Sequence, residues 1–304
     1  MAEPKGHEAH DARLAGDRRT KRAGGRRRGF AQEHLWRRWI WIFTTFQGSG
    51  GARSKPMSEA RAHGLNPVSP VTGQGMEPPA VETNALGRRY GRRWALARVS
   101  LRVARGERLL IAGANGSGKS TLLRVLASLL APSIGSAQVF GHDVATEASA
   151  VRERVALLTY TPGVYEDLSA RENLRAQLRL LGRDDAPEAL LERVGLELRD
   201  DPVRGYSAGM RKRLSFARLL MQRPDLALLD EPYGQLDPEG FKMVDGLVAE
   251  LSQAGATVIM ASHMVERAGA LCDRGVLIDQ GQVRWEGPGP QTARAWDAAH
   301  GVGR

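Results

Sequence analysis

Gly113-Ala-Asn-Gly-Ser-Gly-Lys-Ser-Thr121 is the stretch that decides the fold, because it has the pattern Gly-x-x-x-x-Gly-Lys-Ser. The apolar run 108–112 before it predicts a buried strand, and residues 119–130 after it have the apolar spacing of a helix. Glycines let main-chain N–H groups turn inward around phosphate oxygens, and the start of a helix adds partial positive charge. The strand, loop and helix together therefore predict a phosphate-binding loop.

Two side chains of this loop have defined chemistry with a nucleoside triphosphate. Lys119 would reach the β- and γ-phosphates of ATP, and the Ser120 hydroxyl would ligate Mg²⁺. ATP and Mg²⁺ are therefore the expected ligands. The expected nucleotide contacts are Gly113, Ala114, Asn115, Gly116, Ser117, Gly118, Lys119, Ser120 and Thr121.

The run Leu226-Ala-Leu-Leu-Asp230-Glu231-Pro232 places two carboxylates at the end of another apolar strand. Asp230 is suited to hold Mg²⁺ through a water. Glu231 can face a water positioned against the γ-phosphate and act as a general base. An acidic pair often only ends a strand, but beside a phosphate loop it predicts ATP hydrolysis.

From about Glu82 onward, short apolar runs alternate with amphipathic stretches. This alternation is typical of a mostly parallel sheet that is covered by helices. A further buried strand is predicted at residues 257–261, and a hairpin at residues 275–279 and 282–286. The fold class predicted from these elements is α/β.

Residues 165–222 carry helix signals but no convincing strand. Ser169 and Glu172 form a capping-box pattern ahead of a helix predicted at residues 174–181. We therefore expect a helical insertion at about residues 165–222. Beyond it, residues 241–251 have apolar residues at helical spacing and predict one more helix.

Four further features complete an ordered set: Tyr90 before a strand, the loop Tyr206-Ser-Ala-Gly-Met210, the pair Leu236-Asp237, and Ser262-His263 after a strand. Together with the phosphate loop and the acidic pair, this set resembles the ABC-type ATPases over about residues 82–288. The resemblance implies a P-loop NTPase fold. Its expected parts are an N-terminal antiparallel β portion, a mostly parallel central sheet and the helical insertion.

The resemblance also implies roles for single residues. Tyr90 would stack on adenine, and His263 would contact the γ-phosphate as the switch histidine, which makes Lys119, Glu231 and His263 the expected catalytic residues. Tyr206–Met210 is similar to the signature loop of the family, and Leu236-Asp237 is similar to its D-loop. These two loops would add the nucleotide contacts Ser207, Ala208, Gly209 and Asp237. Because the signature loop lies on a separate insertion, the resemblance implies a head-to-tail dimer with two ATPs sandwiched between the subunits.

The sequence departs from the family pattern in two places. Tyr160 and Thr161 stand where the family usually has a glutamine that contacts magnesium and senses the membrane partner. The resemblance therefore does not predict that this chain couples ATP hydrolysis to a membrane partner through a glutamine at this position. The signature loop has Tyr206, Ala208 and Met210 in place of commoner residues. Alanine keeps the loop small, so we expect its phosphate contact to survive.

The formal net charge of +10 is concentrated near the N-terminus. Residues 1–56 carry 13 Lys and Arg and 5 Asp and Glu, a net of +8, so the remainder is nearly neutral. Residues 1–80 show no sustained period, and we expect a disordered basic arm and linker there, followed by one ATP-binding domain at 81–304. Within the arm, Leu35–Phe46 clusters three tryptophans. This cluster is either a membrane-surface segment or part of an extension upstream of the true start of translation.

The single cysteine, Cys272, cannot form an internal disulfide and matches no metal-ligand spacing, which indicates a reducing compartment. No run reaches the roughly 18 to 20 apolar residues of a membrane-spanning helix, and Trp39–Phe46 is the best candidate. We therefore expect a cytoplasmic protein that is peripheral on the inner face of the cell membrane. ATP hydrolysis would power a separate transmembrane permease subunit.

The transported substrate cannot be read from this sequence. Within the family, residues 165–174 and 207–214 look most like the ATP-binding subunit of the haem exporter of cytochrome c biogenesis, which is the expected system. One alternative is an exporter of drugs, lipids or polysaccharides. Another is a soluble ABC ATPase that acts on nucleic acid or ribosomes, which only the basic arm favours. A transporter would also need a second ATP-binding subunit, either a second copy or a related chain.

Overall fold

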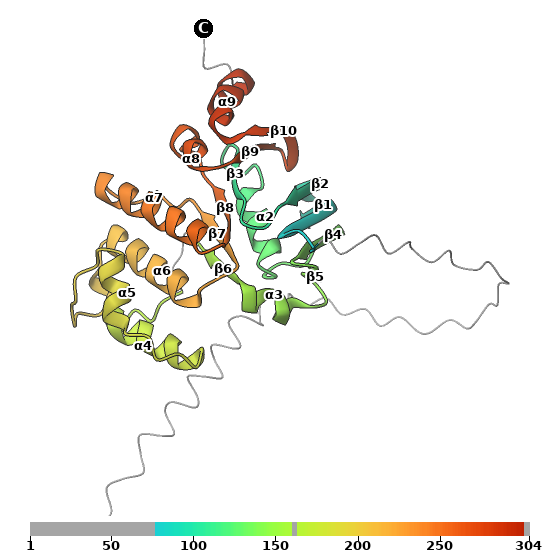
Figure 1. Ribbon diagram of the computed structural model, residues 1–304. Helices are drawn as coiled ribbons and strands as arrows, with labels where there is room; N and C mark the ends of the chain where they lie inside the picture. The colour runs from blue at the N-terminus through green and yellow to red at the C-terminus, as the bar shows by residue number, and fades with distance from the viewer. Residues whose placement is uncertain (1–76, 160–162, 301–304) are drawn as a thin grey trace, which may run out of the picture. The chain divides into compact units, whose positions relative to one another are not determined.

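The computed structural model describes residues 77–159 and 163–300 (Figure 1). These residues belong to one compact unit, Ser69–Arg304. Most of the expected basic arm lies outside the described residues, and so do Tyr160 and Thr161. In the described ranges, no helix is both long enough and apolar enough to cross a membrane.

A mostly parallel sheet of six strands forms the centre of the fold, in the order β10-β9-β3-β8-β7-β6. Its strands are β3 (Arg108–Ala112), β6 (Val155–Leu158), β7 (Leu226–Asp230), β8 (Thr257–Ala261), β9 (Arg274–Asp279) and β10 (Gln282–Pro288). Only β9 and β10 pair antiparallel within this sheet. All residues of β7 and β8 are buried, as expected for strands whose two faces are both covered.

A second sheet of four strands is antiparallel, in the order β2-β1-β4-β5. Its strands are β1 (Val81–Tyr90), β2 (Arg93–Val103), β4 (Ile134–Val139) and β5 (His142–Asp143). The β1–β2 hairpin turns at Gly91 and Arg92, so that Tyr90 is the register partner of Arg93. The expectation of an N-terminal antiparallel β portion beside a mostly parallel sheet is therefore confirmed.

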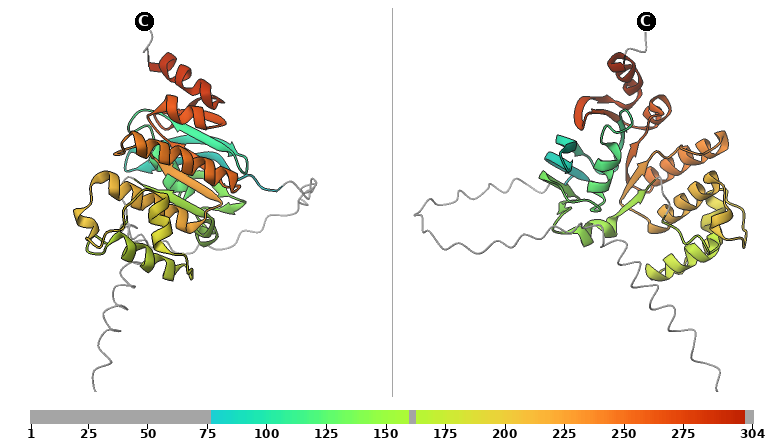
Figure 2. Two further views of the ribbon diagram at one scale, coloured as in Figure 1. Left: turned by 60° about the vertical axis from the view of Figure 1, so that its left-hand side comes forward. Right: turned by 180° about the vertical axis from the view of Figure 1, so that it is seen from behind.

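Helix α2 (Lys119–Leu126) lies between the two sheets, where it contacts β7 and β8 of one and β2 and β4 of the other (Figure 2). The helix is four residues shorter than the 119–130 predicted from its apolar spacing. Ser128 adopts a φ of +55°, and the amides of Ser128 and Leu129 donate to the carbonyls of Val125 and Arg124. This Schellman pattern closes the helix early.

The remaining helices outside the insertion either connect two strands or follow the last strand. They are α3 (Ala148–Arg154), α7 (Pro238–Gln253), α8 (Val265–Leu271), α9 (Thr292–His300) and the short 3₁₀ turn η2 (Gly289–Gln291). Their apolar side chains divide between two cores. One core joins the antiparallel sheet to α2, and the other joins the opposite face of the parallel sheet to α7, α8 and the helices described next.

Between β6 and β7 the described residues form helices and no strand: α4 (Ala170–Leu180), α5 (Pro187–Arg193), the 3₁₀ turn η1 (Val203–Gly205) and α6 (Ala208–Gln222). Ser169 and Glu172 do form a capping box, since each side chain bonds the other residue's main-chain N–H. The capped helix therefore begins at Ala170 and not at residue 174. Figure 1 shows these helices grouped on one side of the sheet.

Two glycine positions test this packing in opposite directions. A Cβ at Gly275 in β9 would lie 1.9 Å from Oγ1 of the buried Thr292, whereas a Cβ at the exposed Gly246 in α7 would meet nothing within 4 Å. We expect Gly275→Ala to lower the free energy of unfolding by about 1–3 kcal/mol. Gly246→Ala should raise it by roughly 0.5–1 kcal/mol. Urea denaturation of both variants measures this, and equal effects would contradict the packing described here.

Candidate active site

Three loops with polar residues meet at the carboxyl edge of the parallel sheet. The phosphate loop follows β3, Asp230 and Glu231 end β7, and Ser262-His263 follows β8. β8 lies between β3 and β7 and pairs parallel with both, so the three loops leave the sheet at the same edge. This edge is the usual ligand site of an open α/β sheet.

The phosphate loop is held in a conformation that needs glycine. Gly116 has a φ of +80° and Gly118 a φ of +115°, and a Cβ on Gly118 would lie 2.4 Å from the carbonyl oxygen of Ala95. The hydroxyl of Ser117 is buried and has no hydrogen-bond partner among the described residues. The loop therefore packs closely at the start of α2, and the buried Ser117 hydroxyl has a hydrogen-bonding capacity that no described residue satisfies.

Lys119 is buried at the start of α2, and its ammonium turns back onto the phosphate loop. Its Nζ donates to the carbonyl oxygens of Gly113 at 2.7 Å and Ala114 at 3.2 Å. Burial lowers the pKa of Lys119 below its ordinary value, and the charges of Glu231 and Asp230 oppose that shift. The ammonium thus sits inside the loop, where it could exchange these carbonyls for phosphate oxygens.

Ser120 and Asp230 meet across the two loops. The Ser120 hydroxyl donates to Oδ1 of Asp230 at 2.9 Å. Burial raises the pKa of the Asp230 carboxyl, while the hydrogen bond from Ser120 acts against that rise. A hydroxyl and a carboxylate beside a phosphate loop match the oxygen ligands that Mg²⁺ takes together with substrate phosphates. The donor set therefore fits a magnesium nucleotide.

Glu231 lies between a histidine and Lys119. Its Oε2 is 2.7 Å from Nδ1 of His263 and accepts the His263 main-chain N–H at 3.3 Å, while its Oε1 is 4.0 Å from Nζ of Lys119. The structure thus brings together the three side chains that were expected to be catalytic. A carboxylate beside this ammonium could accept a proton from a water near a bound phosphate.

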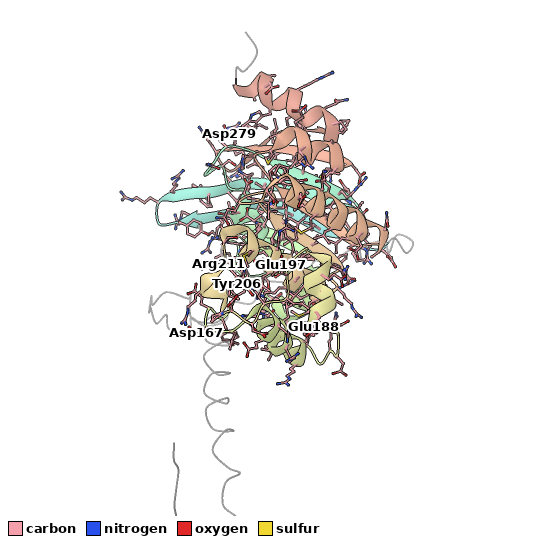
Figure 3. The ribbon with its side chains drawn as sticks, turned by 90° about the vertical axis from the view of Figure 1, so that its left-hand side faces the viewer. Asp167, Glu188, Glu197, Tyr206, Arg211 and Asp279 are labelled. Carbon is pink, nitrogen blue, oxygen red and sulfur yellow. The ribbon has the colours of Figure 1, made fainter. Side chains whose placement is uncertain are left out.

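The signature loop lies at the start of α6. The Ser207 hydroxyl accepts the Met210 N–H at 3.2 Å and caps the helix, with Ala208 and Gly209 in its first turn. Tyr206 is buried beside it, and Figure 3 shows Tyr206 and Arg211 at this end of the insertion. Across the described residues, no hydrogen bond or ion pair joins this loop to the phosphate loop of the same chain.

Asp237 serves as the N-cap of α7. Its Oδ1 accepts the Gly240 N–H at 2.8 Å and also faces Arg213 of α6 at 3.3 Å. The carboxylate is 61% exposed, so one face stays open to another molecule. Its capping role gives a structural reason for this residue beside the nucleotide contact expected from the family.

Tyr90 ends β1 with 46% of its surface exposed, and Arg88 lies over its ring at 5.2 Å. Its register partner Arg93 places a guanidinium nitrogen 4.0 Å from where a Cβ on Gly116 would lie. The hairpin end with Tyr90 and Arg93 therefore lies next to the phosphate loop. An exposed ring there is available to stack on a base.

Sequence reasoning missed one charged residue next to this site, Lys212 of α6. Its ammonium is buried and donates to the carbonyl oxygen of Glu231 at 2.8 Å and of Asp230 at 3.4 Å. Burial lowers the pKa of Lys212 to about 8. The sequence signal was the position of Lys212, because it lies at helical spacing from Phe216 and Leu219, which are also buried in α6.

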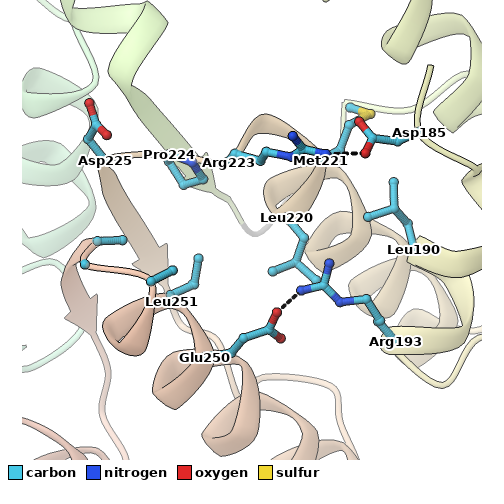
Figure 4. A pocket seen from close by; sticks show the side chains of 13 residues that line it. Asp185, Leu190, Arg193, Leu220, Met221, Arg223, Pro224, Asp225, Glu250 and Leu251 are labelled. Carbon is cyan, nitrogen blue, oxygen red and sulfur yellow. Dashed lines mark hydrogen bonds and ion pairs between the residues drawn. The ribbon is translucent and has the colours of Figure 1, made fainter. Parts of the chain in front are cut away.

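A cavity of about 390 Å³ lies elsewhere, at the other end of β7 (Figure 4). Pro224 and Asp225 on its wall precede β7, whereas Asp230 ends that strand. Two ion pairs, Arg193 with Glu250 and Arg223 with Asp185, lie at its rim. The cavity is thus separated from the phosphate loop by the length of the strand.

Comparisons with known proteins find similar sequences over most of the described residues. The family described as ABC transporter matches residues 96–234. The daunorubicin resistance ATP-binding protein DrrA3 of Streptomyces coeruleorubidus is 41% identical over 70% of this chain and 69% of its own length. The bacitracin transport ATP-binding protein BcrA of Bacillus licheniformis is 32% identical over 68% of this chain and 69% of its own length.

Solved structures show the same fold. An ATP-binding subunit of an ABC transporter matches 73% of this chain and 95% of its own length at 27% identity, with a TM-score of 0.65. The ATP-binding cassette MJ0796, in a dimeric post-hydrolysis state bound to ADP and Pi, matches 68% of this chain and 98% of its own length. The TM-score of that match is 0.63 at 24% identity.

The position of Lys119 generates a direct test. Lys119→Ala removes the only ammonium that faces the phosphate loop within the described residues, so we expect the affinity for ATP with magnesium to fall at least about 100-fold. The control is Lys242→Ala, which removes an exposed lysine on α7. Titration calorimetry measures both variants. Retained wild-type affinity in Lys119→Ala would contradict the phosphate contact.

Proposed function

Because the chain belongs to the ABC transporter family as an ATP-binding subunit that hydrolyses ATP, we propose that it powers the export of drug-like or antibiotic compounds through a separate membrane subunit. The named relatives carry this proposal, since one is a daunorubicin resistance protein and the other a bacitracin transport protein. An exporter of this kind was one of the alternatives that the sequence left open.

These relatives favour a drug or antibiotic exporter over the haem exporter expected from residues 165–174 and 207–214. Those two stretches lie around α4 and the start of α6, beside the signature loop. Residues 207–214 include the proposed nucleotide contacts Ser207 to Gly209, so a likeness in that stretch says little about the cargo. The cargo would be selected by the separate membrane subunit. None of the described helices of this chain is long and apolar enough to cross a membrane.

The proposed nucleotide site uses the residues described above. Lys119 and the amides of residues 113–121 would hold the triphosphate, with Tyr90 stacked on the base. Ser120 and Asp230 would hold Mg²⁺, which supplies charge neutralisation of the β- and γ-phosphates when it is bound. When the γ-phosphate enters, Lys119 and His263 can donate to its oxygens in place of their present acceptors.

Glu231 is the proposed general base. With Lys119 and His263 turned to the phosphate, its carboxylate is free to accept a proton from the attacking water. The water oxygen then bonds to the γ-phosphorus as the bond to the β,γ-bridging oxygen breaks, which yields ADP and inorganic phosphate. The 2.7 Å contact between Glu231 and His263 supports this role, because it places the carboxylate beside the histidine that would bind the γ-phosphate.

A second ATP-binding subunit would complete each site. The signature loop at Ser207 to Gly209 has no bond to its own phosphate loop in the described residues, so it would serve the ATP of a partner subunit. Asp237, with its exposed carboxylate, would lie at the same interface. Closure on ATP and opening after hydrolysis would drive a membrane subunit at the inner face of the cell membrane.

Co-purification separates this proposal from its rival. The full chain is tagged in the organism that encodes it and is purified from a mild detergent extract of those cells. We expect a polytopic membrane protein to co-purify with it. Export of an apolar drug should then require both proteins. Recovery of ribosomes or DNA in place of a membrane protein would support a soluble ATPase that acts on nucleic acid and would contradict the transporter assignment.

Replacing the proposed base gives a second test. Glu231→Gln keeps the shape of the side chain but removes the proton acceptor, so ATP should still bind while turnover falls at least about 100-fold. The variant should accumulate as an ATP-bound dimer in size-exclusion chromatography. Glu239→Gln, an exposed carboxylate in the first turn of α7, is the control. Normal hydrolysis by Glu231→Gln would remove Glu231 from the mechanism.

A further inference from the structure

Lys212, a residue of the helical insertion, hydrogen-bonds to the backbone of Glu231. Lys212 of α6 is 4% exposed, and its ammonium donates to the main-chain carbonyls of Glu231 at 2.8 Å and Asp230 at 3.4 Å. In the described ranges this ammonium forms no ion pair with a carboxylate within 4.0 Å. Its hydrogen bonds therefore go to the backbone of the two residues whose side chains form the proposed catalytic site.

The backbone of Glu231 needs such support. Glu231 has a φ of +47°, in the left-handed region that residues with a Cβ rarely occupy, and the following Pro232 favours an extended conformation for the residue before it. Strain of this kind persists only where the surroundings hold it in place. The conformation matters because it sets where the carboxylate points.

Three main-chain contacts hold Glu231. Its N–H donates to Ala261 of β8 at 2.8 Å, and its carbonyl accepts the Gly234 N–H at 3.2 Å within its own turn. The third contact is the bond from Lys212, which among these three is the one that comes from α6. Helix α6 begins at the signature loop, so Lys212 connects that loop to the backbone of the proposed base.

We propose that Lys212 is a positioning residue for ATP hydrolysis, which fixes the left-handed backbone of Glu231 and thereby aims its carboxylate from the helix that carries the signature loop. The inference rests on the proposed role of Glu231 as the base. Lys212 itself faces carbonyl oxygens and has no bond to the carboxylate oxygens of Glu231, which are 2.7 Å from His263 and 4.0 Å from Lys119.

The energetics favour a positioning role over a stabilising one. Taking an ammonium out of water carries a large desolvation cost, which two neutral carbonyl acceptors offset only in part. A methionine at position 212 would keep the apolar stem without that cost, and the Glu231 carbonyl would still accept the Gly234 N–H. The fold should therefore tolerate Lys212→Met, but the orientation of the Glu231 carboxylate should change.

The experiment uses the full chain and compares Lys212→Met with Lys212→Arg, which keeps a long cationic donor. Lys242→Met, the same replacement at an exposed lysine of α7, is the matched control. We expect Lys212→Met to lower kcat at least about tenfold, because small misplacements of a reacting group are costly. Its KM for ATP should stay within about twofold, and the melting temperature should change little. Lys212→Arg should recover most of the lost kcat.

A double-mutant cycle with Glu231→Gln separates positioning from other effects. Once the base is gone, Lys212→Met should leave the residual rate unchanged. Normal kcat in Lys212→Met, a change in KM alone, or an additive loss in the double mutant would overturn the proposal. If Glu231→Gln itself hydrolyses ATP normally, the base assignment fails first. If Glu231→Gln is inactive but Lys212→Met is normal, only the positioning role fails.

A folding failure would not leave the question open. Each variant is checked for ATP binding and cooperative melting before its rate is measured. Should Lys212→Met fail this check, Lys212→Leu, which removes the donor and keeps an apolar side chain, is measured in its place with the same cycle. A folded Lys212→Leu with wild-type kcat would then overturn the proposal.

Discussion

The buried ammonium of Lys119 is the interaction on which the rest of the site depends. It lies inside a loop in which Gly116 and Gly118 have positive φ, bonded to the carbonyls of Gly113 and Ala114, with Glu231 4.0 Å away. A buried charge is tolerable only with such partners. Here two of the partners are neutral carbonyl oxygens, which charged phosphate oxygens could replace. A triphosphate brings stronger acceptors, so the ligand completes a site that the fold leaves under-satisfied.

The carboxyl edge of the sheet supplies the other groups because the strands beside it are parallel. Glu231 and His263 meet because β7 and β8 end in register, with Asp230 paired to Ala261. Ser120 reaches Asp230 from the loop after β3, which pairs with the other side of β8. The helical insertion adds a second connection to this edge. Lys212 hydrogen-bonds α6, the helix that begins at the signature loop, to the backbone of Glu231.

The sequence predicts the parts of the fold that local pattern controls. The phosphate loop between β3 and α2, the buried strand that ends in Asp230 and Glu231, and the capping box of Ser169 and Glu172 are each readable from neighbouring residues. The end of α2 is not, because it depends on Ser128 adopting a left-handed conformation in a stretch whose apolar spacing continues. The contact of Lys212 with Glu231 joins residues that are not neighbours in the chain, so it depends on the tertiary placement of α6 beside the residues that follow β7.

The most direct measurement is a crystal structure of the full chain with magnesium and a non-hydrolysable ATP analogue. The account predicts that Nζ of Lys119 leaves the Gly113 carbonyl for phosphate oxygens, that Ser120 ligates the metal, and that Glu231 parts from Lys119 to face a water beside the γ-phosphate. A nucleotide bound away from residues 113–121, with Lys119 still bonded to Gly113, would contradict it.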